Sequence, residues 1–140
     1  MAKDIINPHA NCVVCSTANA HGMGVKFLTQ ADGSVKANFD CSEIYQGYSN
    51  VLHGGIISAL LDGAMANCML SKGIHAVTAE LNIKFIYSVR CNEPVEIEAW
   101  LTRNTSRLYL LESKITQADE IMATAKAKFM AIIEPPVEGN

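Results

Sequence analysis

An aspartate stands in the middle of an apolar run that otherwise has the pattern of a buried helix. Asp62 lies in the segment LHGGIISALLDGAMANCML, from Leu52 to Leu70, between mostly apolar neighbours. A carboxylate in such surroundings needs a partner, a metal or a chemical role, because burying an unpaired charge is costly. The open alternatives are a catalytic base or nucleophile, an ion pair with Lys84 or Arg90, or a carboxylate that faces solvent.

The same segment begins with a histidine and two glycines, His53, Gly54 and Gly55. The first turn of a helix has free N–H groups at the positive end of the helix dipole, so it can bind an anion. Glycine keeps this backbone accessible, and a carbonyl oxygen could be held there as in an oxyanion hole. An oxyanion site and a carboxylate together indicate attack on a carbonyl group, with Asp62 as base or nucleophile. Without that role, HGG is a turn followed by a helix.

Helical spacing predicts a helix from Gly54 to Lys72, ended by a glycine at position 73. Its two faces differ in residue size. The larger, apolar face belongs in the core and consists of Ile56, Ile57, Leu60, Leu61, Ala64 and Cys68. The other face is mostly small and consists of Gly55, Ser58, Ala59, Asp62, Met65, Ala66 and Met69. We expect the small face to be the site, with Met65 either lining it or filling the core or an interface.

Strands are expected on both sides of this helix. Asp32-Gly33 is a hairpin turn between two short runs, and short turns also separate the runs after the helix, so neighbouring strands pair antiparallel. A single sheet must curl around a single helix to bury it, which gives an α+β fold in one domain, 1–140. The expected strands are 24–30, 35–40, 76–89, 95–103, 107–116 and 121–133. Strict alternation in 76–89 places Ala79, Leu81, Ile83, Phe85 and Tyr87 on one face, opposite Thr78, Glu80, Asn82 and Lys84.

Composition excludes several classes of protein. Apolar residues make up 49% and charged residues 18%, as in globular domains. A net charge of -3 with unclustered basic residues argues against binding to nucleic acid. No apolar stretch is judged long enough for a membrane span, and the first residues lack the features of a signal peptide. The odd number of 5 cysteines indicates free thiols and a cytoplasmic location.

The motif HGGIISALLDGAM resembles that of the PaaI-like, hotdog-fold acyl-CoA thioesterases. TAELNIKFIYSV resembles the strand after the helix in the same family. CVVCSTANAHGMGVKF and YQGYSNVLHGG resemble the N-terminal part of its longer bacterial members and of related mitochondrial thioesterases. The similarity runs from about Cys12 to the last strand. It implies a hotdog fold, in which an antiparallel sheet wraps around the helix.

The resemblance also implies an activity, the hydrolysis of an acyl-CoA thioester to a free acid and coenzyme A. In that family pattern Asp62 is the catalytic carboxylate and acts across a dimer interface on a thioester held at the other subunit's helix start. Gly54 supplies the oxyanion N–H, His53 positions the thioester, and Thr78 orients the attacking water. The resemblance implies a homodimer or homotetramer and no metal or redox cofactor, coenzyme A being part of the substrate.

Further candidates for substrate binding surround this motif. Some family members carry an Asn six residues before the histidine, whereas this chain has Gly47 there. Gln46 and Asn50 are therefore the polar side chains available to contact the substrate. Gly55, in the first turn of the helix, is a further candidate for substrate binding. Arg103 and Arg107 flank a turn and either bind the phosphates of coenzyme A through their guanidinium groups or lie in solvent.

Alternatives to hydrolysis and to free thiols stay open in the sequence. A hydratase on the same fold would need a histidine acting with the carboxylate, and none lies near Asp62 on the helix. A non-catalytic acyl-CoA-binding module would keep the pocket without the chemistry. Cys12 and Cys15 form half of a zinc knuckle, with His21 nearby. Because a structural zinc needs four ligands and no second pair follows, we expect reduced thiols and no metal.

Overall fold

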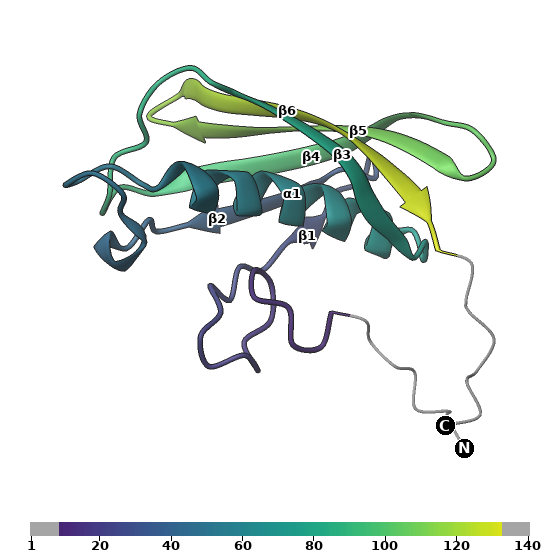
Figure 1. Ribbon diagram of the computed structural model, residues 1–140, viewed down its shortest axis with the longest axis horizontal. Helices are drawn as coiled ribbons and strands as arrows, with labels where there is room; N and C mark the ends of the chain where they lie inside the picture. The colour runs from purple at the N-terminus through teal and green to yellow at the C-terminus, as the bar shows by residue number, and fades with distance from the viewer. Residues whose placement is uncertain (1–8, 133–140) are drawn as a thin grey trace.

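In the computed structural model of the chain, which describes residues 9–132, one long helix lies against a six-stranded sheet (Figure 1). The sheet curves over the helix, so the apolar side chains of both meet in one core. The elements are β1 (Leu28–Thr29), β2 (Val35–Phe39), a 3-10 turn (Glu43–Tyr45), α1 (Gly54–Ser71), β3 (Ala76–Phe85), β4 (Val95–Asn104), β5 (Leu108–Gln117) and β6 (Glu120–Ala131).

The sheet is antiparallel throughout, with the strand order β1-β2-β4-β5-β6-β3. The predicted α+β fold, an antiparallel sheet wrapped around one helix, is confirmed. Helix α1 lies between β2 and β3 in the sequence, and these strands end up in different halves of the sheet. As a result β3 is an edge strand, hydrogen-bonded to β6 on one side only. The expected strand over 24–30 is shorter than predicted, since only Leu28–Thr29 pairs with β2.

The bounds of α1 follow from its capping residues. His53 is extended, with φ -63° and ψ 136°, and its side chain accepts a hydrogen bond in the first turn. At the other end Gly73 has φ 73°, and Gly73 and Ile74 donate to the carbonyls of Leu70 and Met69, which is the Schellman arrangement. The helix therefore ends at Ser71 with Lys72 as its cap, within one residue of the prediction.

Helix α1 buries more of its surface than a division into two faces predicted. Met65 and Met69 are 0% and 1% exposed and belong to the core. Their assignment to the open face beside Asp62 is wrong, because the curved sheet brings five strands, β2 to β6, into contact with α1. By length and composition alone this helix could cross a membrane, contrary to the sequence expectation. Here it is the core helix of the fold, lying along the sheet.

A β-bulge in β3 changes which side chains face the helix. The pairing with β6 shifts between Thr78 and Glu80, so Ala79 is an extra residue. Thr78 is paired with the buried Phe129, which places it on the helix side, and the alternation then resumes with Leu81 also on that side, opposite the buried Ala127. Strict alternation wrongly placed Thr78 on the opposite face from Leu81, because one inserted residue reverses the pattern.

The N-terminal segment packs against α1 at Gly63. A Cβ atom at this position would lie 2.7 Å from Val14 Cγ1, closer than carbon atoms approach one another. We therefore expect Gly63→Ala to lower the free energy of unfolding by about 1–3 kcal/mol, the usual cost of overpacking, although alanine favours helices. Chemical denaturation measures this. The penalty should largely disappear when Gly63→Ala is made in a Val14→Ala background, and an equal penalty in both backgrounds would contradict the contact.

Candidate active site

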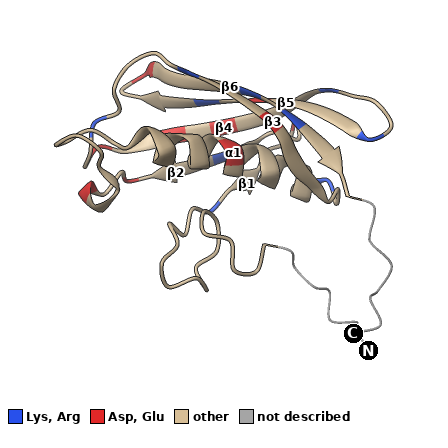
Figure 2. Ribbon diagram, in the orientation of Figure 1, with Lys and Arg blue, Asp and Glu red and all other residues tan. Residues whose placement is uncertain are grey.

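Asp62 and Thr78 form a hydrogen-bonded pair at the open edge of the helix–sheet layer. Thr78 Oγ1 donates to Asp62 Oδ1 at 2.6 Å, joining the middle of α1 to the beginning of β3. Asp62 is the acidic residue of α1, marked red on the helix in Figure 2. It is half-buried, and Thr78 is exposed. The bulge in β3 makes this contact possible, because it turns the Thr78 side chain toward the helix.

The two ion pairs considered for Asp62 are absent from the described part of the chain. Arg90 pairs instead with Glu93. Within residues 9–132, neither Asp62 nor Lys84 forms a salt bridge. Thr78 occupies one carboxylate oxygen, Oδ1. Among described residues no hydrogen bond is made to Oδ2, so this oxygen is available to accept a proton or to contact a ligand.

The start of α1 leaves one backbone donor without an acceptor. Gly55 N–H donates to His53 Nδ1 at 2.8 Å, and the N–H groups of Ile56 and Ile57 both donate to the His53 carbonyl. Gly54 N–H makes no hydrogen bond within residues 9–132. Because Nδ1 accepts from a backbone N–H, a neutral His53 ring carries its proton on Nε2, as a second donor. The first turn therefore offers Gly54 N–H, whereas Gly55 N–H is engaged.

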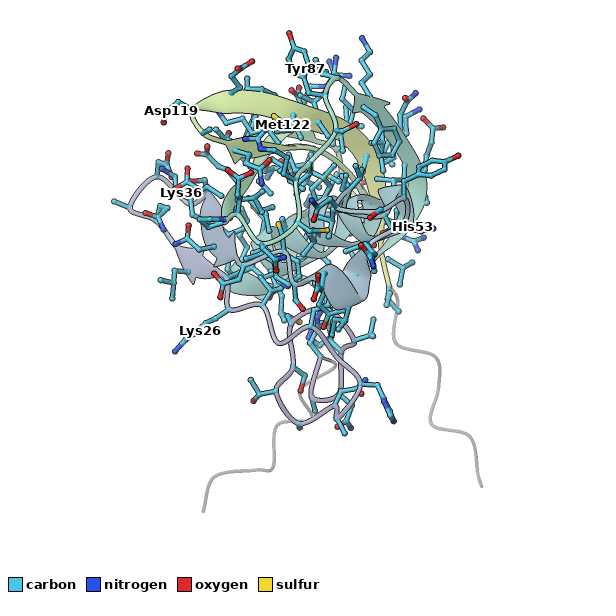
Figure 3. The ribbon with its side chains drawn as sticks, turned by 90° about the vertical axis from the view of Figure 1, so that its left-hand side faces the viewer. Lys26, Lys36, His53, Tyr87, Asp119 and Met122 are labelled. Carbon is cyan, nitrogen blue, oxygen red and sulfur yellow. The ribbon has the colours of Figure 1, made fainter. Side chains whose placement is uncertain are left out.

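A cavity of about 670 Å³ opens at this end of the helix. His53 and Gly54 contribute polar groups, and most of the wall is apolar or aromatic. Figure 3 views the molecule from the end at which α1 begins and labels His53 and Tyr87, two of the lining residues. The remaining wall is formed by Gly47, Tyr48, Val51, Leu52, Ile57, Phe85, Ile86, Ser88 and Val89.

Apart from His53 and Gly54, the residues of this wall were not predicted as site residues, and several of the large ones come from β3 and the turn after it. Phe85, Ile86 and Tyr87 come from the end of β3 and the turn after it, about 30 residues beyond the helix start. Their exposed fractions are 56%, 49% and 56%. Three consecutive large apolar residues left open at a strand end are a signal of a binding surface, but alternation assigned them to the strand alone.

Gln46 and Asn50 form the turn that leads into the helix. Gln46 Oε1 accepts the N–H of Asn50 at 3.1 Å, and Asn50 adopts a left-handed φ of 68°. Gln46 lines a second, smaller hollow beside His53 and Gly55. Gly47 packs closely on His53, since a Cβ at position 47 would lie 3.3 Å from His53 Cα and from its ring. This turn thus holds His53 in place. Gln46 Oε1 already accepts a hydrogen bond within the turn.

The structure does not bring the other predicted substrate contacts to this cavity. Met65 is fully buried in the core and lines none of the described pockets. Arg103 lies at the exposed end of β4, and Arg107 Nη2 donates to the Ala131 carbonyl at 3.4 Å. This β4–β5 turn is at the opposite end of the molecule from the start of α1 (Figure 1). Within one chain, these arginines lie away from the helix start.

Asp62 and the helix start are also separated within one chain. Asp62 lies eight positions after Gly54 along α1, a rise of about 12 Å at 1.5 Å per residue. A carbonyl group that is attacked and stabilised at once must lie about 3 Å from the attacking atom and from the oxyanion donor, and a base that acts through water must lie within hydrogen-bond reach of that water. A separation of about 12 Å along one helix exceeds this combined reach, so one chain does not place Asp62 and Gly54 N–H on the same carbonyl.

Comparison with known proteins gives one family and a set of similar folds. The family model described as "Thioesterase superfamily" matches residues 49–124, which include α1 and most of the sheet. A protein of Archaeoglobus fulgidus that carries an esterase name is 29% identical over 118 residues, covering 81% of this chain and 76% of that protein.

Three solved structures share the fold. A thioesterase superfamily protein superimposes with a TM-score of 0.83 at 23% identity, covering 93% of this chain and 71% of that one. The E. coli PaaI protein of the phenylacetic acid degradation operon gives 0.75 at 19% identity, with 83% and 85% covered. A Streptococcus mutans protein bound to acetyl-CoA gives 0.72 at 18% identity, with 77% and 88% covered.

Proposed function

Since the chain belongs to the thioesterase superfamily, we propose that it hydrolyses acyl-CoA thioesters to a free acid and coenzyme A. The match over residues 49–124 and the fold shared with E. coli PaaI confirm the sequence resemblance to PaaI-like hotdog thioesterases. The observation that carries the proposal is the pair of unsatisfied groups, Asp62 Oδ2 and Gly54 N–H. One can accept a proton, and the other can donate a hydrogen bond to an oxyanion.

In the proposed reaction Asp62 acts as the general base. Its Oδ2 takes a proton from a water molecule, and the water oxygen bonds to the thioester carbonyl carbon. Negative charge moves to the carbonyl oxygen, which accepts a hydrogen bond from Gly54 N–H at the positive end of α1. The C–S bond then breaks, and the leaving thiolate takes up the proton as coenzyme A. Thr78 holds the Asp62 carboxylate in one orientation.

We infer that two copies of the chain complete each site, because Asp62 and Gly54 of one copy are too far apart for a single carbonyl. Strand β3 is the edge that supports this inference. Its outer side has no neighbouring strand within residues 9–132, and Val77, Leu81 and Phe85 are 53%, 38% and 56% exposed on this strand. Pairing two such edges would place the Asp62–Thr78 edge of one copy beside the other copy, in a homodimer or in a tetramer of two dimers.

The cavity supports an acyl group as the part of the substrate that is recognised. Its aromatic and aliphatic wall suits an apolar acyl or aryl chain, and His53 Nε2–H and Gly54 N–H supply polar contacts at its mouth. A solved structure of similar fold is bound to acetyl-CoA, which supports a coenzyme A thioester as ligand. The proposed chemistry uses water, the side chains of Asp62 and Thr78 and the backbone N–H of Gly54, without a cofactor in the active site.

Release of coenzyme A from a panel of short, medium, long and aryl acyl-CoAs tests this proposal. We expect thiol release with one class preferred, followed continuously with a thiol reagent. Oxygen esters of the same acyl groups serve as the control for a general esterase. Binding of acyl-CoA with no thiol release from any member of the panel would contradict hydrolysis and favour a binding module.

A further inference from the structure

The N-terminal segment, residues 9–25, brings three metal-ligating side chains together outside the active site. It lies beyond the helix–sheet layer, shown as the purple loop in Figure 1. Ligand atoms of His9, Cys12 and Cys15 all lie within 4.8 Å of one another, and His9 Nδ1 is 3.3 Å from Cys15 Sγ. His21, the histidine singled out in the sequence, is not part of this cluster.

The backbone turn between the cysteines fixes the position of one sulfur atom. Cys12 Sγ accepts the N–H groups of Val14 at 3.3 Å and of Cys15 at 3.4 Å. These contacts hold Cys12 Sγ near the ligand atoms of Cys15 and His9, so the three donors are close together before a cation binds.

The segment has little core of its own to hold it in place. Its buried side chains are Val14, Ser16 and Val25, and it contains neither a strand nor an α-helix. It contacts α1 through Val14, which lies against Gly63. Short segments without a sufficient core are commonly stabilised by a metal or a disulfide, and Val14 lies between the two cysteines of the cluster.

We propose that His9, Cys12 and Cys15 bind one zinc ion, which holds the turn that packs on α1 through Val14 at Gly63. Two thiolates and an imidazole are ligands that zinc prefers, and three protein ligands leave a fourth tetrahedral position for water. Each thiol gives its proton to solvent as the ion binds. The proposal replaces the expectation of no metal. That expectation looked for ligands after Cys15 and at His21, whereas the structure supplies His9 from before Cys12.

Metal content of tag-free, full-length protein tests this site independently of activity. Protein stripped with a chelator would be dialysed against zinc ions, and separately against cobalt(II) ions as a spectroscopic probe. We expect about one zinc per chain, an intense visible spectrum of tetrahedral thiolate-bound cobalt, and a Tm that rises when zinc is restored. His9→Gln and Cys12→Ser should each weaken zinc binding at least tenfold.

His21→Gln is the matched control, because it removes an exposed histidine from the same segment outside the cluster. It should bind zinc as the wild type does. The proposal would be overturned by wild-type protein that binds no more zinc than Cys12→Ser, or by equal losses in His9→Gln and His21→Gln. Protein in which any Cys12–Cys15 disulfide has been reduced, and which still binds no zinc, would overturn it too. Since zinc is measured directly, this outcome is separate from any failure to hydrolyse acyl-CoA.

Discussion

Asp62→Asn is expected to lower kcat for the best acyl-CoA substrate by about a hundredfold or more, the range for loss of a general base. Asparagine keeps the shape of the side chain and can still contact Thr78, but it cannot take a proton from water. The fold should be unaffected, because Asp62 is half-buried and pairs with a neutral hydroxyl rather than with a cation. KM should change little, since the cavity wall does not include Asp62.

Thr78→Val tests the hydrogen-bond partner of Asp62. It removes the 2.6 Å hydrogen bond and leaves a side chain of similar shape. Because a hydrogen bond to a charged group contributes about 1.5–3 kcal/mol, we expect kcat to fall by about tenfold to a hundredfold, no more than in Asp62→Asn. Circular dichroism and oligomeric state, measured for both variants, exclude misfolding. Full activity in Asp62→Asn would mean that another residue carries the chemistry.

Gly54→Pro is the second substitution with a large expected effect. It deletes the one first-turn N–H that has no acceptor among described residues and leaves the rest of the turn in place. Proline is favoured at the first position of a helix, and the preceding residue should be extended, as His53 already is with ψ 136°. If Gly54 N–H stabilises the oxyanion, kcat should fall by about a hundredfold to a thousandfold.

Gly54→Ala is the control for the added side chain. It retains the N–H, and its Cβ would lie 3.6 Å from Phe85 Cε1, an ordinary van der Waals contact. We expect a much smaller loss, seen mainly in KM because Gly54 and Phe85 both line the cavity. Equal losses of kcat in Gly54→Pro and Gly54→Ala would assign the effect to steric exclusion and contradict the oxyanion role.

Much of the fold was predictable because it depends on local signals. The helix is defined by apolar spacing between His53 and Gly73, and the antiparallel order follows from short turns. Thr78 was connected with the site only through the family resemblance, as a residue that orients water, and its hydrogen bond to Asp62 was not predicted. Residue alternation gave no hint of this hydrogen bond, because a bulge at Ala79 leaves no clear mark in a sequence of alternating side chains.

Features that depend on long-range packing could not be predicted. Whether Met65 is buried depends on how far the sheet wraps around α1, and periodicity along the helix does not contain this information. The cavity wall at Phe85 is brought to Gly54 by the path of β3 across the sheet. His9 reaches Cys15 through the irregular N-terminal segment, where no periodic pattern exists to be interpreted.

The central claim is that Asp62 of one copy and Gly54 N–H of another act on the same thioester, and mixed dimers test it most directly. Asp62→Asn and Gly54→Pro chains, each inactive alone, would be co-refolded and assayed for coenzyme A release. A mixed dimer has one site with both defects and one site with neither. With random assortment about half of the dimers are mixed, so about a quarter of wild-type activity should return. No recovery above the two single variants, in dimers shown to have mixed, would contradict a shared site.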